Sequence, residues 1–209
     1  MLKKLLTAIA TVATAAMLLN ASIAFAQDVA PDELIRKNTA EVLALLKADK
    51  DLAAGDIAKV EKMANDKILP YFNFPRMTQL AVGRNWREAT DTQKTALTNE
   101  FRRLLVRTYA SSLSQFRNQT IEVRPLKLAA TDAEVVVKTV INQSGGAGVP
   151  LDYSMEKGKD GWKIFDVLID GVSLVTNYRS SFATEIKNGG IDGLIKSLAD
   201  RNAKNAAKK

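Results

Sequence analysis

After an apolar run at its very start, the first half of the chain repeats its hydrophobic residues every three or four positions, which is the period of a helix. This pattern predicts a helix over residues 32–47 and a second one that begins after Gly55-Asp56. Pro70 ends the second helix, because proline cannot continue a helical hydrogen-bond ladder. A short segment, 74–82, follows. The apolar positions of the two helices are Leu34, Ile35, Val42, Leu45, Leu46, Ile57, Val60, Ala64 and Ile68.

The longest predicted helix begins at Thr90 and runs to about Phe116. Thr90 and Gln93 form a capping box, in which the side chain of each residue bonds the backbone N–H of the other. The apolar stripe that follows continues over several turns and predicts a helix in the core. It consists of Leu97, Phe101, Leu104, Leu105, Tyr109, Leu113 and Phe116.

From about residue 120 the hydrophobic period changes to two, which is typical of strands with one buried face and one solvent-exposed face. Glycine-rich turns at 144–148 and 157–161 join consecutive strands, so we expect an antiparallel meander. The predicted strands cover residues 121–124, 135–142, 149–156 and 162–169.

Helices return at the C-terminal end. Ser173 can cap a helix that stops at Gly189-Gly190, and residues 191–198 are predicted to form a last short helix. Residues from about Asp200 onward are rich in Lys, Asn and Ala, and this basic tail, 200–209, is expected to fray.

This order of elements indicates an α+β fold: an antiparallel sheet of about four strands with helices packed on one face, in a cone-shaped, cystatin-like arrangement. The chain shows no internal repeat and no linker, so residues 27–209 are expected to form a single domain. A curved sheet with helices across its concave side encloses a wedge of apolar space. Either side chains or a ligand must fill that wedge.

The start of the chain has the pattern of a cleavable signal peptide. Lys3 and Lys4 precede an apolar run, 5–19, and Ala24-Phe25-Ala26 is a small-x-small cleavage pattern. We therefore expect cleavage after Ala26 and export to the periplasm. A membrane anchor is the alternative, but the run is short for a bilayer core of roughly 30 Å.

Charge and residue usage limit the chemistry. The chain has 30 Lys and Arg against 23 Asp and Glu, a net charge of +7, and the leader contributes two of the lysines. This mild surplus suits a solvated surface and transient contact with anionic lipid head groups, and an exported protein is not expected to bind nucleic acid. The chain has no Cys and no His, which removes the commonest nucleophiles, general bases and zinc ligands. We expect no enzyme activity, no metal and no cofactor.

Two patterns could still indicate chemistry. Asp166 and Asp170 are four residues apart and could share a face for acid–base work, although capping or ion pairing with Arg179 is the favoured interpretation. Gly189-Gly190 and Gly193 resemble a phosphate-binding loop, but they follow a helix and lack the lysine of a P-loop. The ending of a helix explains them better.

Five sequence blocks occur in order along the chain, and together they resemble the MlaC family, also described as the toluene-tolerance auxiliary family of ABC transport systems. The resemblance covers about Asp32 to Leu198. The blocks are 68–74 (ILPYFNF), 83–87 (GRNWR), 101–110 (FRRLLVRTYA), 162–167 (WKIFDV) and 171–182 (GVSLVTNYRSSF).

The resemblance implies a soluble periplasmic shuttle that maintains the lipid asymmetry of the outer membrane. Members of the family pass glycerophospholipid between an outer-membrane lipoprotein–porin complex and an inner-membrane complex with an ABC ATPase and an MCE-domain ring. They hold the acyl tails in a pocket between sheet and helices. We expect such a protein to act as a monomer, with no catalytic residues.

Candidate pocket residues are the inward-facing apolar positions of the predicted sheet and helices. Each of them could equally belong to an ordinary core, which leaves two alternatives to a carrier: a small α+β enzyme with Asp166 at the pocket floor, or an adaptor with a filled interior. For Arg84, Trp86, Tyr178 and Arg179 a structural role is favoured over docking to a partner. The candidate lipid-binding residues are Leu105, Tyr109, Val135, Val137, Leu151, Tyr153, Met155, Val172 and Val175.

Overall fold

The computed structural model describes residues 29–113, 119–143 and 146–207. The predicted leader, 1–26, and its cleavage site lie outside the described residues, as does the predicted end of the long helix at Phe116. The helices are α1 (Pro31–Ala48), α2 (Lys50–Ala54), α3 (Ile57–Met63), η1 (Ala64–Ile68), η2 (Leu69–Tyr71), α4 (Phe74–Val82), η3 (Gly83–Arg87), α5 (Asp91–Leu113) and α6 (Leu174–Ala207). The strands are β1 (Thr120–Val123), β2 (Glu134–Val137), β3 (Thr139–Asn142), β4 (Val149–Gly158), β5 (Gly161–Ile169) and β6 (Val172–Ser173).

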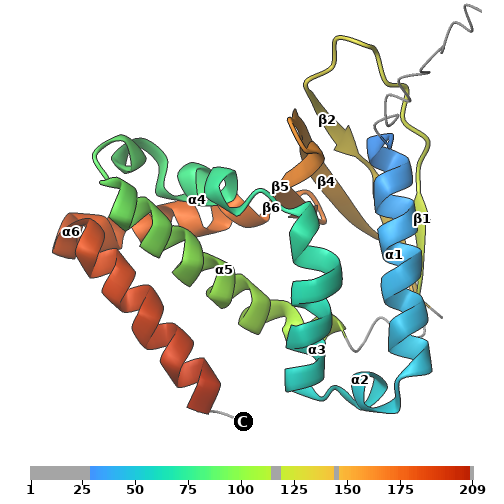
Figure 1. Cartoon of the computed structure of the whole chain (residues 1–209), viewed down its shortest axis with the longest axis horizontal. Coiled ribbons are helices and arrows are strands. Elements are labelled where there is room, and N and C mark those ends of the chain that lie inside the picture. Colours follow the sequence, from blue (N-terminus) through green and yellow to red (C-terminus); the bar gives the residue numbers. More distant parts are fainter. Residues whose placement is uncertain (1–28, 114–118, 144–145, 208–209) are drawn as a thin grey trace, which may run out of the picture.

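The predicted α+β class is confirmed, with two parts visible in Figure 1. In one part α1 lies along the antiparallel sheet, and in the other α4, α5 and α6 pack on one another. The end of α5 reaches back to α3, so this helix connects the two parts.

The sheet has six strands, in the order β1-β3-β4-β5-β6 with β2 also paired to β4, so the predicted number of about four is too low. One reason is that the predicted strand 135–142 is divided at Lys138 into β2 and β3, which pair with different parts of β4. At the division the backbone N–H of Thr139 donates to Asp152 Oδ1 at 3.2 Å, and the Thr139 hydroxyl donates to the carbonyl oxygen of Leu151. Side-chain hydrogen bonds therefore replace part of the backbone ladder.

The other reason is β6, which forms a tight hairpin with β5. Asp170 and Gly171 make the turn with φ values of 50° and 77°. A two-residue turn with two positive φ values matches the twist of a hairpin, and Asp-Gly is a favoured sequence for it. The signal for this short strand was thus present in the sequence.

A bulge in β5 fastens the helical segments to the sheet. The register between β4 and β5 shifts so that Phe165 has no partner on β4. Next to the bulge, Phe72 pairs with Ile164 in a parallel bridge, and the Asn73 N–H donates to the carbonyl oxygen of Ile164 at 2.8 Å. The chain between η2 and α4 is therefore tied to the middle of β5.

Local capping explains where the helices begin. The predicted capping box is confirmed: the Gln93 N–H donates to Thr90 Oγ1 at 3.2 Å, and the Thr90 N–H donates to Gln93 Oε1 at 3.0 Å. Asp56 caps α3 as expected from its position, by accepting from the N–H of Lys59 at 3.0 Å. The helix α2 was not predicted, although Asp49 caps it in the same way.

The predicted break between the two C-terminal helices is confirmed: α6 is interrupted by a kink at Gly190, whose φ of 67° is not helical. The end of the second helix differs from the prediction, because α6 continues to Ala207 although residues from about Asp200 were expected to fray. The reason is a tertiary contact: Asn202 is buried, and its side-chain amide donates to the carbonyl oxygen of Glu100 on α5 at 2.9 Å.

The buried residues form three separate hydrophobic clusters. The first joins α4, α5 and α6, the second joins the sheet to α1, and the third joins α1, α2, α3 and η1. Their members include Met77, Leu97, Phe101, Val175 and Phe182 in the first, Ile35, Val137, Met155, Trp162 and Ile164 in the second, and Val42, Leu46, Leu52, Val60 and Met63 in the third.

The first cluster makes a clear prediction for Phe101. Its ring is fully buried, with centroids 5.1 Å from Tyr178 and 5.2 Å from Phe182. Phe101→Ala should lower the free energy of unfolding by about 3–5 kcal/mol, because the lost contacts leave a cavity. Urea denaturation measures this, with the exposed Arg103→Ala as control, expected to change stability by less than about 0.5 kcal/mol. Equal losses in the two variants would contradict this packing.

Asp166 makes a second prediction, because its carboxylate holds the start of α6. Its oxygens accept from the Ser173 hydroxyl at 2.5 Å and from the Val175 N–H at 3.1 Å. Asp166→Ala should lower the free energy of unfolding by about 1–3 kcal/mol, because buried donors lose their acceptor. Asp170→Asn is the control and should leave the urea midpoint unchanged. A stable Asp166→Ala variant would show that the carboxylate has another role.

Candidate functional site

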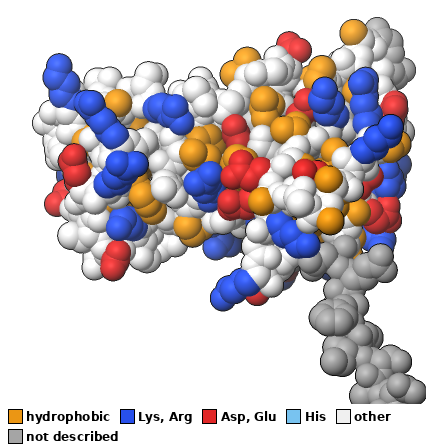
Figure 2. Space-filling model, turned by 90° about the horizontal axis from the view of Figure 1, so that it is seen from above, with side chains coloured by type: hydrophobic (Ala, Val, Ile, Leu, Met, Phe, Trp, Pro, Cys, Tyr) orange, Lys and Arg blue, Asp and Glu red, His pale blue; other side chains and the backbone are white. Residues whose placement is uncertain are grey.

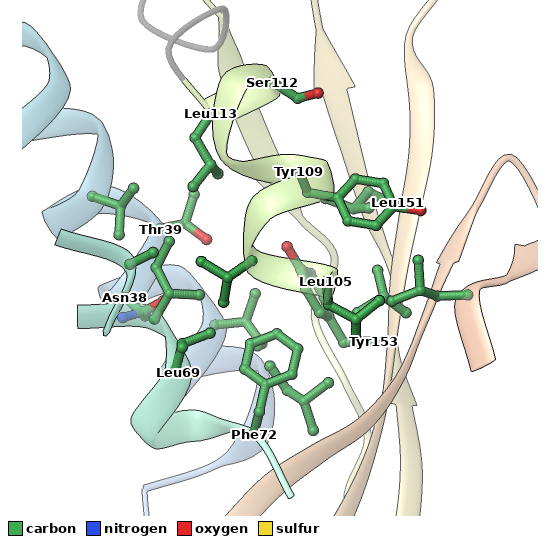
Figure 3. Close-up of a pocket in the computed structure, with 18 of the residues that line it drawn as sticks. Asn38, Thr39, Leu69, Phe72, Leu105, Tyr109, Ser112, Leu113, Leu151 and Tyr153 are labelled. Atoms are coloured by element: carbon green, nitrogen blue, oxygen red, sulfur yellow. The ribbon is translucent and has the colours of Figure 1, made fainter. Parts of the chain in front are cut away.

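An apolar pocket with a volume of about 410 Å³ lies between the helices and the sheet. Figure 3 shows its labelled side chains converging from α1, η2, α5 and β4. The lining residues are Ile35, Asn38, Thr39, Val42, Leu43, Leu46, Ala64, Ile68, Leu69, Phe72, Phe74, Met77, Leu105, Val106, Tyr109, Ser112, Leu113, Ile121, Leu151, Tyr153, Ile164, Val167, Ile169 and Leu174.

The pocket lies where the three hydrophobic clusters meet. Leu105 comes from the first cluster, Ile164 from the second and Leu46 from the third, and all three line the same space. Each cluster is packed internally, but the three clusters do not pack fully against one another. The cavity therefore lies between them and is lined by residues of all three.

The walls of the pocket are uncharged. Among the described residues that line it there is no Asp, Glu, Lys or Arg, and the polar side chains are those of Asn38, Thr39, Tyr109, Ser112 and Tyr153. The amide of Asn38 donates to the carbonyl oxygen of Lys67 at 2.5 Å, so this group connects α1 to η1 in the pocket wall. Such a lining favours hydrocarbon over any charged ligand group.

The two tyrosines stay neutral phenols. Burial raises the pKa of Tyr153 well above its usual value. Burial is also the main cause that raises the pKa of Tyr109, with smaller effects from the charge of Tyr178 and a hydrogen bond to it. Neither hydroxyl can act as a base near neutral pH.

The structure brings four of the nine candidate residues together at the pocket: Leu105 and Tyr109 from α5, and Leu151 and Tyr153 from β4. The other five do not line it. Val137 and Met155 are fully buried in the second cluster, where Val135 packs against them, and Val175 is buried in the first. Val172 lies on the short strand β6 and is 62% exposed.

Sequence reasoning missed the wall that α1 provides. The helix was predicted, and its apolar stripe was visible, but nothing in the pattern indicated that it faces the sheet across a gap. The same is true of Leu69 in η2 and of Phe72, which follows η2 and pairs with Ile164 of β5. The missed α1 residues are Ile35, Asn38, Thr39, Val42, Leu43 and Leu46.

Asp166, the carboxylate of the alternative enzyme hypothesis, does not line the pocket and instead caps the start of α6, as the favoured interpretation predicted. Within residues 29–113, 119–143 and 146–207, no group of three or more acidic side chains is placed to hold a metal ion. No helix in these ranges has both the length and the apolar character needed to cross a membrane.

Comparison with known proteins gives consistent matches. The family model described as MlaC protein matches residues 36–200. A solved structure of a phospholipid-binding protein from Ralstonia solanacearum, in complex with a phospholipid, is 41% identical, with a TM-score of 0.78. The match covers 84% of this chain and 98% of that one.

Two further relatives are more distant. The Haemophilus influenzae protein named intermembrane phospholipid transport system binding protein MlaC is 24% identical over 93% of this chain and 91% of its own length. The toluene tolerance protein ttg2D of Pseudomonas putida is 25% identical over 78% of this chain and 75% of its own length. Because the family model matches residues 36–200, which is most of the chain, this chain belongs to the MlaC protein family.

Proposed function

We propose that this protein is a periplasmic phospholipid carrier that shuttles glycerophospholipids between outer- and inner-membrane complexes and so maintains the lipid asymmetry of the outer membrane. One observation supports this above all. The uncharged pocket lies in a chain 41% identical to a protein whose structure contains a phospholipid. The pocket volume of about 410 Å³ falls within the range of ~300–1,000 Å³ found for small-molecule sites.

The energetics of lipid transfer explain why such a pocket is sufficient. Two acyl tails of roughly fifteen methylenes each, at about 0.8 kcal/mol per methylene, cost on the order of 20 kcal/mol to hold in water. A carrier pocket needs only to be as apolar and water-free as the bilayer interior, so the free energy of transfer from the bilayer to the carrier can be close to zero. The direction of transport then comes from the docking partners and their ATPase.

The acyl chains, in this proposal, lie between α1 and η2 on one side and α5 and β4 on the other. Leu105, Tyr109, Leu151 and Tyr153 form the wall on the second side. Val137 and Met155 support the sheet from the closed part of the core and set the position of β4. The phospholipid head group remains near the opening, because the lining offers it no charged partner.

The cellular setting follows from the leader and the family. We propose cleavage after Ala26, a periplasmic monomer, and docking to an outer-membrane lipoprotein–porin complex and an inner-membrane MCE and ABC complex. Transient contact with a membrane surface suits the mild positive charge. A catalytic role is not part of the proposal: the described residues of the pocket lining include no carboxylate, and its two phenols stay protonated.

The first test is the content of the pocket. Protein purified from a Gram-negative periplasm without detergent should carry phospholipid, since the tails would otherwise face water. Native mass spectrometry should show the protein with an added phospholipid mass, and extraction should identify it. Protein that is free of lipid under these conditions would count against the carrier and favour an adaptor.

The second test fills the pocket. Thr39 lines the cavity, and Thr39→Trp should displace on the order of three methylenes of an acyl chain, which lowers the affinity for a fluorescent phospholipid by roughly 50-fold. The neighbouring Ala40 is exposed and does not line the cavity, so Ala40→Trp is the matched control. Ser112→Trp repeats the test from α5. Full lipid binding by both filled variants, with unchanged circular dichroism, would refute this location.

A further inference from the structure

A second concave surface lies on the helical part of the molecule. The end of α4, η3 and the first half of α6 enclose a groove of about 1070 Å³, and none of its lining residues also lines the apolar pocket. Its floor includes Leu80, Trp86 and Ile186, all partly exposed. The groove is therefore a separate surface with apolar area open to solvent.

The charge of the groove is of one sign. The described residues that line it include no carboxylate and four cationic side chains: Arg84, Arg87, Arg179 and Lys187. Figure 2 shows basic side chains together with some apolar and acidic ones over this helical end of the molecule. Like charges around one concavity raise the local positive potential and attract anionic groups.

Two lysines elsewhere on the helices are paired with carboxylates. Lys62, on α3, is 2.6 Å from a carboxylate oxygen of Asp66, and Lys196, at the far end of α6, is 2.8 Å from one of Asp200. Among the described residues, none of the four groove cations has a carboxylate within 4.0 Å. Arg179 donates to the carbonyl oxygen of Leu80 at 3.1 Å, which fixes one side of the groove.

We propose that this groove docks an acidic segment of a protein partner, one that combines carboxylates with apolar side chains. The carboxylates would pair with the four cations, and the apolar side chains would cover Leu80, Trp86 and Ile186. The concave shape favours a narrow protein segment over a flat bilayer, and the volume exceeds that of a single phosphate. The inference does not depend on what fills the apolar pocket.

A binding assay with charge-reversal variants tests the proposal. The probe is a short fluorescent peptide that combines glutamates with leucines, and its twin has glutamine in place of every glutamate. The groove variant is Arg84→Glu with Lys187→Glu. Lys138→Glu with Lys159→Glu changes the net charge equally at exposed positions outside both cavities. Fluorescence anisotropy measures peptide binding, flotation measures binding to phosphatidylglycerol vesicles, and native mass spectrometry measures bound phospholipid.

The proposal expects the acidic peptide to bind the natural protein. Its affinity for the groove variant should be at least about fivefold lower, and its affinity for the control variant should stay within about twofold of that for the natural protein. The glutamine peptide should not bind, and bound phospholipid should be unchanged. Equal losses in both variants, or no binding by the natural protein, would overturn the proposal. Loss of vesicle binding without loss of peptide binding would do the same and would assign the groove to the membrane surface.

Discussion

Three hydrophobic clusters that face one another without merging are the feature on which the rest of this structure depends. Protein interiors normally close to the density of organic crystals, and empty apolar space is costly, at ~24 cal/mol per Å³ of cavity. At this rate a cavity of about 410 Å³ would cost about 10 kcal/mol if it were closed and vacant. A hydrocarbon guest removes this cost, so the chain is best packed when it carries one.

Polar contacts hold the layers at the distance that keeps the pocket open. Asn73 ties the chain after η2 to β5, Asp166 ties β5 to α6, and Asn38 ties α1 to the end of η1. These hydrogen bonds are directional, whereas hydrophobic contacts are not. They therefore fix the relative positions of the elements around the pocket, which non-directional hydrophobic contacts alone would not do.

The apolar pocket and the basic groove have opposite character. The pocket between α1, α5 and β4 is uncharged and favours hydrocarbon, while the groove of α4, η3 and α6 is basic and opens to water. Helix α4 contributes to both, with Phe74 and Met77 in the pocket and Leu80 in the groove. A carrier that must hold its lipid tightly yet dock briefly benefits from keeping these interactions on separate surfaces, because charge in the pocket would weaken lipid binding.

Signals within a few residues of one another determined much of this fold from the sequence alone. The capping box of Thr90 and Gln93 and the strand over residues 149–156 depend only on neighbours, and both are found as predicted. The number of strands was wrong where tertiary contacts intervened, at Thr139, and where the Asp170-Gly171 turn was overlooked.

Which inward-facing residues meet empty space was decided by the tertiary structure alone. Tyr153 and Met155 share one face of β4, yet Tyr153 lines the pocket and Met155 is sealed among Trp162 and Ile164. Strand alternation assigns a side chain to a face and cannot say what lies opposite. Thr39, more than a hundred residues earlier in the chain, borders the same pocket as Tyr153. Contacts over such separations depend on how whole layers pack, and no local pattern encodes that.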